Sequence, residues 1–277
     1  MPLDEDSLRT AHPNRALVHL ANGDALVWDV RDVKLLRTQH NIIGLMSGTL
    51  PLAPQQNVFL GLPLQLIPEE VSYLLRVGAI VLIDQTALEK EEMMPRTVSP
   101  EEGEDEDPLA TSSSSSGVLI PRPQTSSPHI HTTPQTASSS STFTFPHTQN
   151  DRARCAVFDD LHARGYFLGT GLRFGGEFVV YPGDPLRYHS HFSTTVMAEG
   201  EDMSALDFVA SGRLGTAVKK AHLICAVDTD DVLEKGLESV EEEKDAAGKF
   251  EDGGRLEGRT TWGRVRYYSL TWSGFGT

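Results

Sequence analysis

The chain has 277 residues, of which 39% are hydrophobic and 23% charged, and its formal net charge is -15 at pH 7. Two cysteines without a CxxC pair are too few for a disulfide framework, so a reducing compartment is the simpler expectation. The acidic N-terminus does not resemble a signal peptide, and prolines interrupt the uncharged residues 38–68, so we expect neither secretion nor a membrane span.

The negative charge is confined to two runs. Residues 89–108 contain nine acids and two bases, and residues 228–252 contain eleven acids and three bases, so these runs carry the whole net charge. Such runs are usually solvated and disordered; the alternative is a regulatory mimic of RNA. Because the remainder is neutral, the acidic balance does not exclude a nucleic-acid ligand.

A stretch without core-forming residues divides the chain. Residues 108–150 are rich in Ser, Thr and Pro and cannot bury enough apolar surface to offset the entropy of ordering. With the acidic run before it, we predict a disordered linker over residues 89–150. It separates an N-terminal domain over residues 14–88 from a second domain over residues 151–277, which contains an acidic insertion at residues 228–261.

The first domain begins with a hairpin signal. Apolar residues 16–20 and 25–28 flank Asn22 and Gly23, a pair that favours a type I′ turn. Pro68 followed by two acids predicts the start of a helix that ends near Gly78. Residues 79–83 then read as a buried strand. Nothing here forms a catalytic constellation, so a packing or docking role is the default.

The second domain alternates helices and strands. We predict a helix over residues 151–164, strands over residues 166–168 and 177–181, and a strand-to-strand connection through the glycines of residues 169–176. Ser204 and Asp207 form a capping box that opens a helix ending near Gly212. Strands over residues 221–227 and 265–272 are expected to be neighbours. This mixture predicts an α/β fold.

Residues 181–191 carry the densest chemistry. A strand ending at Tyr181 presents the phenol at a sheet edge, and a proline-stiffened turn returns His189, so the two are a possible acid and base pair. Lys219 and Lys220 directly precede the predicted strand over residues 221–227. Singly, each has an ordinary explanation as a packing, hydrogen-bonded or solvated residue. A metal site at His189 and His191 lacks further nearby ligands.

Residues 164–168, 174–191 and 212–220 closely resemble the tRNA-splicing endonuclease family, and within it the catalytic subunit that cuts the 3′ splice site. Segments within residues 21–28, 55–64 and 68–70 agree, so the resemblance covers both domains and skips the linker. It implies a small N-terminal mixed αβ domain and a C-terminal restriction-endonuclease-like domain, with a central mixed sheet flanked by helices.

The resemblance implies a reaction without metal or cofactor, catalysed by Tyr181, His189 and Lys220. The 2′-hydroxyl of the RNA attacks the phosphate and leaves a 2′,3′-cyclic phosphate and a 5′-hydroxyl. Tyr181 acts as base, His189 as acid and Lys220 as stabiliser of the phosphorane, with Lys219 as the rival lysine. Since an ordinary phenol is mostly neutral at pH 7, we expect a nearby lysine to lower the pKa of Tyr181.

Further cations are expected to contact phosphates, foremost Arg187, Arg213 and Lys219. The resemblance implies an intron-containing pre-tRNA as substrate, and a second catalytic subunit and two structural subunits as partners. It implies the nucleus, or the cytosolic face of the mitochondrial outer membrane. Tyr268 or Trp272 could stack a base, although core or subunit interface is the commoner role of such an aromatic.

Two other functions remain open at this stage. A catalytically silent structural subunit of the same assembly would share the fold, but the presence of all three predicted catalytic residues argues against it. A metal-dependent nuclease of related fold would need a cluster of acids at the strand ends. Glu177 and Asp184 alone make a poor cluster.

Overall fold

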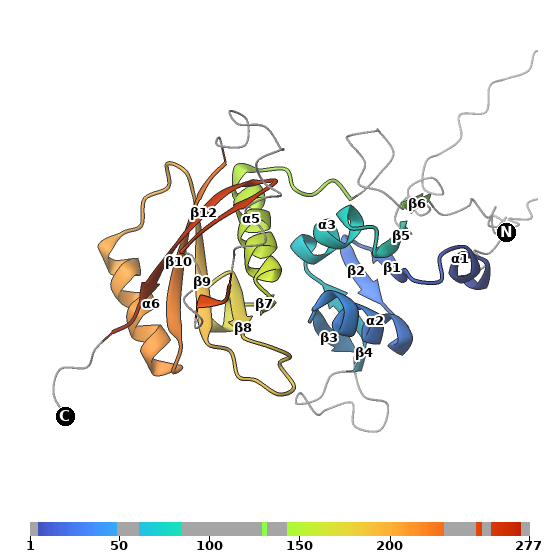
Figure 1. Cartoon of the computed structure of the whole chain (residues 1–277), viewed down its shortest axis with the longest axis horizontal. Coiled ribbons are helices and arrows are strands. Elements are labelled where there is room, and N and C mark those ends of the chain that lie inside the picture. The colour runs from blue at the N-terminus through green and yellow to red at the C-terminus, as the bar shows by residue number, and fades with distance from the viewer. Residues whose placement is uncertain are drawn as a thin grey trace, which may run out of the picture.

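The computed structural model describes residues 5–48, 61–84, 129–131, 143–229, 248–250 and 256–272. Two mixed six-stranded sheets, each accompanied by helices, make up the fold. Figure 1 shows the two sheets side by side, with α5 (Gln149–Ala163) lying between the second sheet and the N-terminal domain. The mixed α/β class predicted from the sequence is confirmed.

The first sheet has the strand order β3-β4-β2-β1-β5-β6. Its strands are β1 (Ala16–Ala21), β2 (Asp24–Val27), β3 (Leu45–Gly48), β4 (Gly61–Leu66), β5 (Ile80–Asp84) and β6 (His129–His131). The predicted hairpin is confirmed: β1 and β2 pair antiparallel, and Asn22 and Gly23 between them have φ angles of 52° and 86°. The predicted strand β5 pairs parallel with β1.

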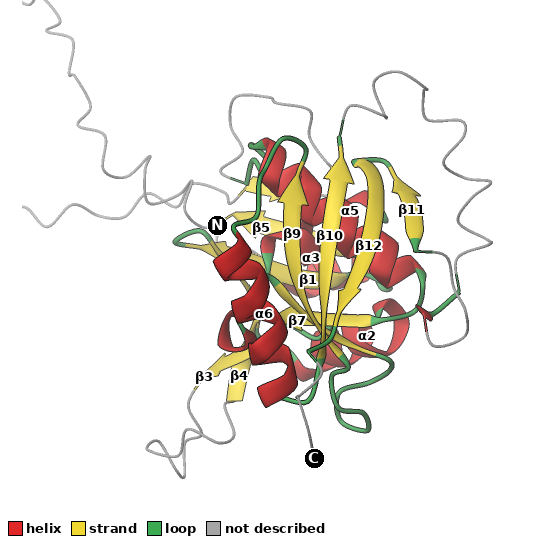
Figure 2. Cartoon of the chain, turned by 90° about the vertical axis from the view of Figure 1, so that its left-hand side faces the viewer, coloured by secondary structure: helices red, strands yellow, loops and turns green. Residues whose placement is uncertain are grey.

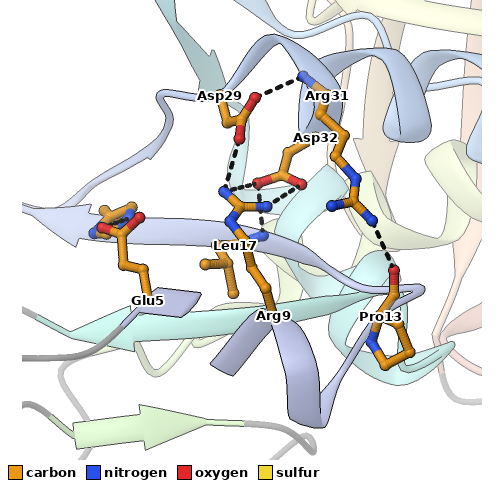
Figure 3. Close-up of polar contacts among 8 residues, drawn as sticks. Glu5, Arg9, Pro13, Leu17, Asp29, Arg31 and Asp32 are labelled. Carbon is orange, nitrogen blue, oxygen red and sulfur yellow. Dashed lines mark hydrogen bonds and ion pairs between the residues drawn. The ribbon is translucent and has the colours of Figure 1, made fainter. Parts of the chain in front are cut away.

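Three helices accompany this sheet: α1 (Glu5–Ala11), α2 (Val30–His40) and α3 (Pro68–Arg76). The sequence predicted only α3, which ends before Gly78 at a φ of 69°. Figure 3 shows how α1 is fastened to the start of α2: the Arg9 guanidinium donates to both carboxylate oxygens of Asp32, at 3.0 and 2.9 Å. Asp32 also accepts the backbone N–H of Leu17, which ties both helices to β1.

The second sheet has the strand order β11-β12-β10-β9-β8-β7. Its strands are β7 (Phe167–Thr170), β8 (Phe178–Tyr181), β9 (Phe192–Ala198), β10 (Ala221–Asp228), β11 (Glu257–Thr260) and β12 (Gly263–Leu270). β9 and β10 are parallel, joined by a crossover through α6 (Ala205–Ala217), whereas β10 and β12 pair antiparallel as expected. The sequence did not predict the strand β9.

Helices cover both faces of this sheet. Figures 1 and 2 show α5 on one face and α6 on the other. Both begin at a serine or threonine cap: Ser204 for α6, as the sequence predicted, and Thr148 for α5, which the sequence analysis did not identify. The predicted end of α6 near Gly212 was wrong, because the helix continues to Ala217. Gly212 is buried against Leu270, so its missing side chain lets α6 pack closely against β12.

Polar contacts fix the N-terminal domain against α5. Glu69 of α3 pairs with Arg154 at 2.7 Å. Arg76 of α3 pairs with Asp159 at 2.6 Å. At the end of α2, the carbonyl oxygen of His40 lies 2.6 Å from the His162 ring of α5. Most buried apolar residues of the two sheets form one continuous core, while Leu17, Val81 and Ile83 of the first sheet form a separate cluster.

The predicted linker and insertion contain described elements. β6 lies within the predicted linker and pairs with β5, and residues 143–150 lead into α5. β11 lies within residues 228–261, which the sequence analysis assigned to an acidic insertion. Because β11 pairs with β12, these four residues belong to the sheet instead. The rest of both segments lies outside the described residues, and the domain boundaries stay predictions. No helix within the described ranges is long and apolar enough to cross a membrane.

Candidate active site

Three strand ends meet at one edge of the second sheet. Tyr181 ends β8, while His191 and Lys220 directly precede the parallel strands β9 and β10. The His191 N–H donates to the carbonyl of Val180 at 2.9 Å, and the His191 carbonyl accepts the N–H of Ala221 at 3.0 Å. Because β8 runs antiparallel to β9, its C-terminal end lies beside the N-terminal ends of the other two.

Ser190 joins the predicted catalytic residues. The Lys220 ammonium donates to the Ser190 carbonyl oxygen at 3.3 Å, and the Tyr181 hydroxyl is hydrogen-bonded with the Ser190 side chain. Ser190 itself is 8% exposed, so it lies under the site, whereas its neighbour His189 is exposed. Tyr181 and Lys220, which are distant in sequence, therefore both contact one buried serine, and His189 is the chain neighbour of that serine.

The end of α6 decides which lysine enters this locality. The Lys219 N–H donates to the Thr216 carbonyl and the Lys220 N–H to the Gly215 carbonyl, which is the Schellman pattern of a helix end. Lys219 occupies the left-handed position with a φ of 56° and is exposed. Lys220 is half-buried instead, with its ammonium 4.9 Å from the centre of the Phe174 ring.

The electrostatic environment of Tyr181 differs from the expectation. Burial raises the pKa of the Tyr181 phenol above its ordinary value, and the hydrogen bond with Ser190 opposes this only in part. The predicted lowering by a nearby lysine was therefore wrong. The ammonium of Lys220 is directed to the Ser190 carbonyl, and desolvation of the half-buried phenol is the larger effect.

The predicted RNA contacts lie on the surface around this edge. Arg187 is exposed in the loop of residues 182–191, Lys219 is exposed at the end of α6, and Arg213 is exposed one turn before that end. The glycines between β7 and β8 form the predicted strand connection, through the short helix η1 (Leu172–Phe174). Across the described residues, no group of three or more His, Cys, Asp or Glu side chains could hold a metal ion.

Sequence reasoning missed four residues near the site: Ser190, Phe174, Lys249 and Arg37. The Lys249 ammonium bonds the carbonyl of Pro182, directly after Tyr181, and the Phe250 N–H donates to the Tyr166 hydroxyl at 2.8 Å. Residues 248–250 of the acidic insertion thus return to the site. An aromatic residue within an otherwise charged run was the signal available for this in the sequence.

Comparison with known proteins agrees with this fold. The family model "TSEN34-like, N-terminal domain" matches residues 16–85. The model "tRNA intron endonuclease, catalytic C-terminal domain" matches residues 152–234, which include the three strand ends. The class of protein is therefore an endonuclease chain with a tRNA intron endonuclease catalytic domain.

Relatives resemble the chain over most of its length. It is 31% identical to the "Probable tRNA-splicing endonuclease subunit sen34" of Schizosaccharomyces pombe, over 94% of this chain and 98% of that protein. It is 27% identical to "tRNA-splicing endonuclease subunit Sen34" of Homo sapiens, over 77% of this chain and 95% of that protein. The "tRNA-splicing endonuclease" of Methanopyrus kandleri is 36% identical over 32% of this chain and 49% of that protein.

The chain belongs to the Sen34 family of tRNA-splicing endonuclease subunits. The family resemblance found in the sequence is confirmed, and the catalytic domain supports an enzymatic subunit. The roles of the individual residues stay predictions.

Proposed function

We propose that this chain is the catalytic subunit that cuts intron-containing pre-tRNA at the 3′ splice site, with Tyr181, His189 and Lys220 as its catalytic residues. The single observation that supports the proposal is the contact of Tyr181 and Lys220 with Ser190, the chain neighbour of His189, at one sheet edge. An exposed imidazole, a phenol and a cation in one locality are the parts needed to cleave RNA by its own 2′-hydroxyl.

The proposed reaction assigns one task to each group. The 2′-hydroxyl loses its proton to Tyr181 as it attacks phosphorus, and the departing 5′-oxygen takes a proton from His189. Lys220 stabilises the negative charge of the phosphorane between them. The products are a 2′,3′-cyclic phosphate and a 5′-hydroxyl, without need of a metal ion or other cofactor. Each positioned proton transfer contributes on the order of 10² to 10⁴ in rate.

The raised pKa of Tyr181 is compatible with a base role. Only a small fraction of the phenol is ionised at neutral pH, but a phenolate of higher pKa is a correspondingly stronger base. The alkaline limb of the cleavage profile then belongs to Tyr181 and lies at higher pH than an ordinary phenol would give, because burial raises the pKa of Tyr181. Single-turnover cleavage by Tyr181→Phe measured across pH 6 to 11 tests this: an unchanged profile would remove the proton-transfer role.

Exposed apolar side chains favour a role for this chain as one subunit of an assembly. Apolar side chains are exposed on α6 and at the end of the last strand: Leu206, Phe208, Leu214, Tyr268 and Trp272. Such a patch fits contact with other subunits, which we propose are a second catalytic subunit and two structural subunits. These subunits would also contribute to RNA binding, together with Arg187, Arg213 and Lys219.

We propose the nucleus as the site of action, with the cytosolic face of the mitochondrial outer membrane as the alternative. Both compartments rest on family resemblance. Imaging of the tagged full chain beside a nuclear and a mitochondrial marker separates them.

The decisive experiment scores the two splice junctions separately. The complex is reconstituted with His189→Ala and incubated with an intron-containing pre-tRNA in EDTA. We expect loss of cleavage confined to the 3′ junction. The matched control is His191→Ala, since His191 contributes its backbone to the sheet edge. Undiminished cutting at the 3′ junction by His189→Ala would refute the proposal and favour a silent structural subunit.

A further inference from the structure

The loop that carries His189 has little support from its own sheet. Residues 182–191 leave β8 after Tyr181 and return to it at their end, where Ser190 bonds Tyr181 and the His191 N–H meets the Val180 carbonyl. Between these points the side chains of residues 186–189 are exposed. A group in such a loop keeps a fixed position only if contacts from elsewhere hold it.

Asp184 organises the interior of this loop. Its carboxylate accepts the N–H of Leu186 at 2.9 Å. Its carbonyl accepts the N–H groups of Arg187 and Tyr188, at 2.8 and 3.0 Å. These three bonds fold residues 184–188 into a compact turn that ends immediately before His189. Through its bond to Leu186, the Asp184 side chain is therefore one of the contacts that shape the turn directly before His189.

Arg37 of α2 holds Asp184 from the N-terminal domain. The Arg37 guanidinium donates from Nη2 to one carboxylate oxygen at 2.7 Å and from Nε to the other at 3.3 Å. The two hydrogen bonds fix the orientation of the Asp184 carboxylate and its distance from the guanidinium. The side chain of Arg37 is 23% exposed and that of Asp184 is 34% exposed. The same contact lowers the pKa of Asp184, so the carboxylate stays ionised and paired. In Figure 1 the loop between β8 and β9 extends toward α2.

The end of α2 is itself fixed against the catalytic domain. The His40 carbonyl is bonded to His162 of α5, so the helix cannot shift without breaking that contact. Shortly after it, Ile43 lies against Gly169 of β7, and the Tyr181 ring lies against the same glycine. Arg37 thus projects from an element whose position is set relative to the strand that ends in Tyr181.

We propose that Arg37 is a positioning residue, which holds Asp184 across the domain boundary so that the loop presents His189 to the scissile phosphate. The inference rests on the proposed function, because it assigns a task to the loop only if His189 takes part in cleavage. It gives the N-terminal domain a part in positioning the loop that carries His189. Arg37 does not act as a phosphate contact in this arrangement, since its guanidinium is paired with Asp184.

The test uses the reconstituted complex and single-turnover cleavage of pre-tRNA with enzyme in excess. We expect Arg37→Ala to slow the 3′ junction about 10- to 100-fold, the cost of a small misplacement of a catalytic group. RNA affinity and cleavage at the 5′ junction stay unchanged. Arg37→Lys keeps the charge but not the paired geometry, and we expect it to slow the 3′ junction by about threefold or more.

Two comparisons separate positioning from general damage. Because Arg37 acts through Asp184, the double variant Arg37→Ala/Asp184→Asn is expected to be no slower than the slower single variant. Arg31→Ala is the matched control, since Arg31 lies on the same helix but donates to the Pro13 carbonyl (Figure 3). It keeps the full rate at both junctions. If Arg37→Ala does not assemble, Arg37→Lys carries the test.

Several results would overturn the inference. They are a full 3′ rate in Arg37→Lys and Arg37→Ala, a loss of rate that more enzyme restores, and additive effects in the double variant. Restoration by more enzyme would mean that Arg37 contacts RNA. His189→Ala in the same assay keeps the two proposals apart: if it cleaves normally the proposed function fails, and if it alone is inactive only the inference about Arg37 fails.

Discussion

The buried carboxyl group of Glu70 makes the stability of this chain depend on pH. Glu70 is 1% exposed, and its two oxygens accept the N–H groups of Gly44 and Ile67 at 3.1 and 3.0 Å. Burial raises the pKa of Glu70 from 4.5 to about 7. Between these values the folded chain binds more protons than the unfolded chain, so the free energy of unfolding falls as the pH rises through this window.

The size of the effect follows from the shift. Each unit of pKa difference corresponds to about 1.4 kcal/mol, so the contribution of Glu70 falls by roughly 3 kcal/mol between pH 4.5 and 7 and is constant above that. Glu70→Gln cannot ionise. Its amide accepts only one of the two N–H groups, which lowers the free energy of unfolding equally at every pH. The change with pH of the difference between wild type and variant therefore reports the ionisation of Glu70.

The assay is urea unfolding of the full chain at pH 5, 6, 7 and 8. The unfolding free energy of the wild type minus that of Glu70→Gln is expected to fall as the pH rises. Glu201→Gln controls for loss of a carboxylate, because Glu201 also accepts a backbone N–H, that of Ala198, but at an exposed position. Parallel curves for the wild type and Glu70→Gln would show that burial of this carboxyl does not shift its pKa.

Three further substitutions test the packing around the site, each by urea unfolding. Lys219→Gly removes a side chain from a left-handed position and is expected to stabilise the chain by about 1 kcal/mol; no gain would contradict the assigned helix end. Arg154→Ala leaves the fully buried Glu69 carboxylate unpaired and is expected to cost about 3 kcal/mol, which Glu69→Gln in the same chain partly restores. Gly176→Ala would place a β-carbon 2.2 Å from the Thr194 carbonyl oxygen, and we expect a loss of about 2 kcal/mol; a neutral effect would refute that close approach.

Local signals predicted most of the elements, because the residues that cause them are neighbours in sequence. Asn22 and Gly23 specify their turn whatever surrounds them, and the Ser204 cap of α6 bonds Asp207, three residues away. The strand β9 escaped prediction because its buried residues include polar ones. Ser193 is satisfied by His222 of β10, 29 residues away, and such a partner cannot be read from the strand itself.

In the candidate site, too, local motifs could be predicted from the sequence, whereas contacts between distant residues could not. The motif around Tyr181 and His189 identified the family, but not how the residues meet. The role of Ser190 depends on the pairing of three strands, and the pKa of Tyr181 depends on burial that the assembled fold creates. Arg37 and Asp184 are 147 positions apart and belong to different domains. Contacts of that range leave no periodic or local pattern in a sequence.

The parallel pairing of β9 with β10 has a consequence during synthesis. Lys220 reaches Ser190 only after α6 has crossed the sheet and Ala221 has bonded His191, so the site depends on contacts between residues about 30 positions apart. Such long-range closures form late relative to turns and single helices. A nascent polypeptide that has not yet emerged as far as Ala221 therefore lacks the strand pairing that brings Lys220 to Ser190.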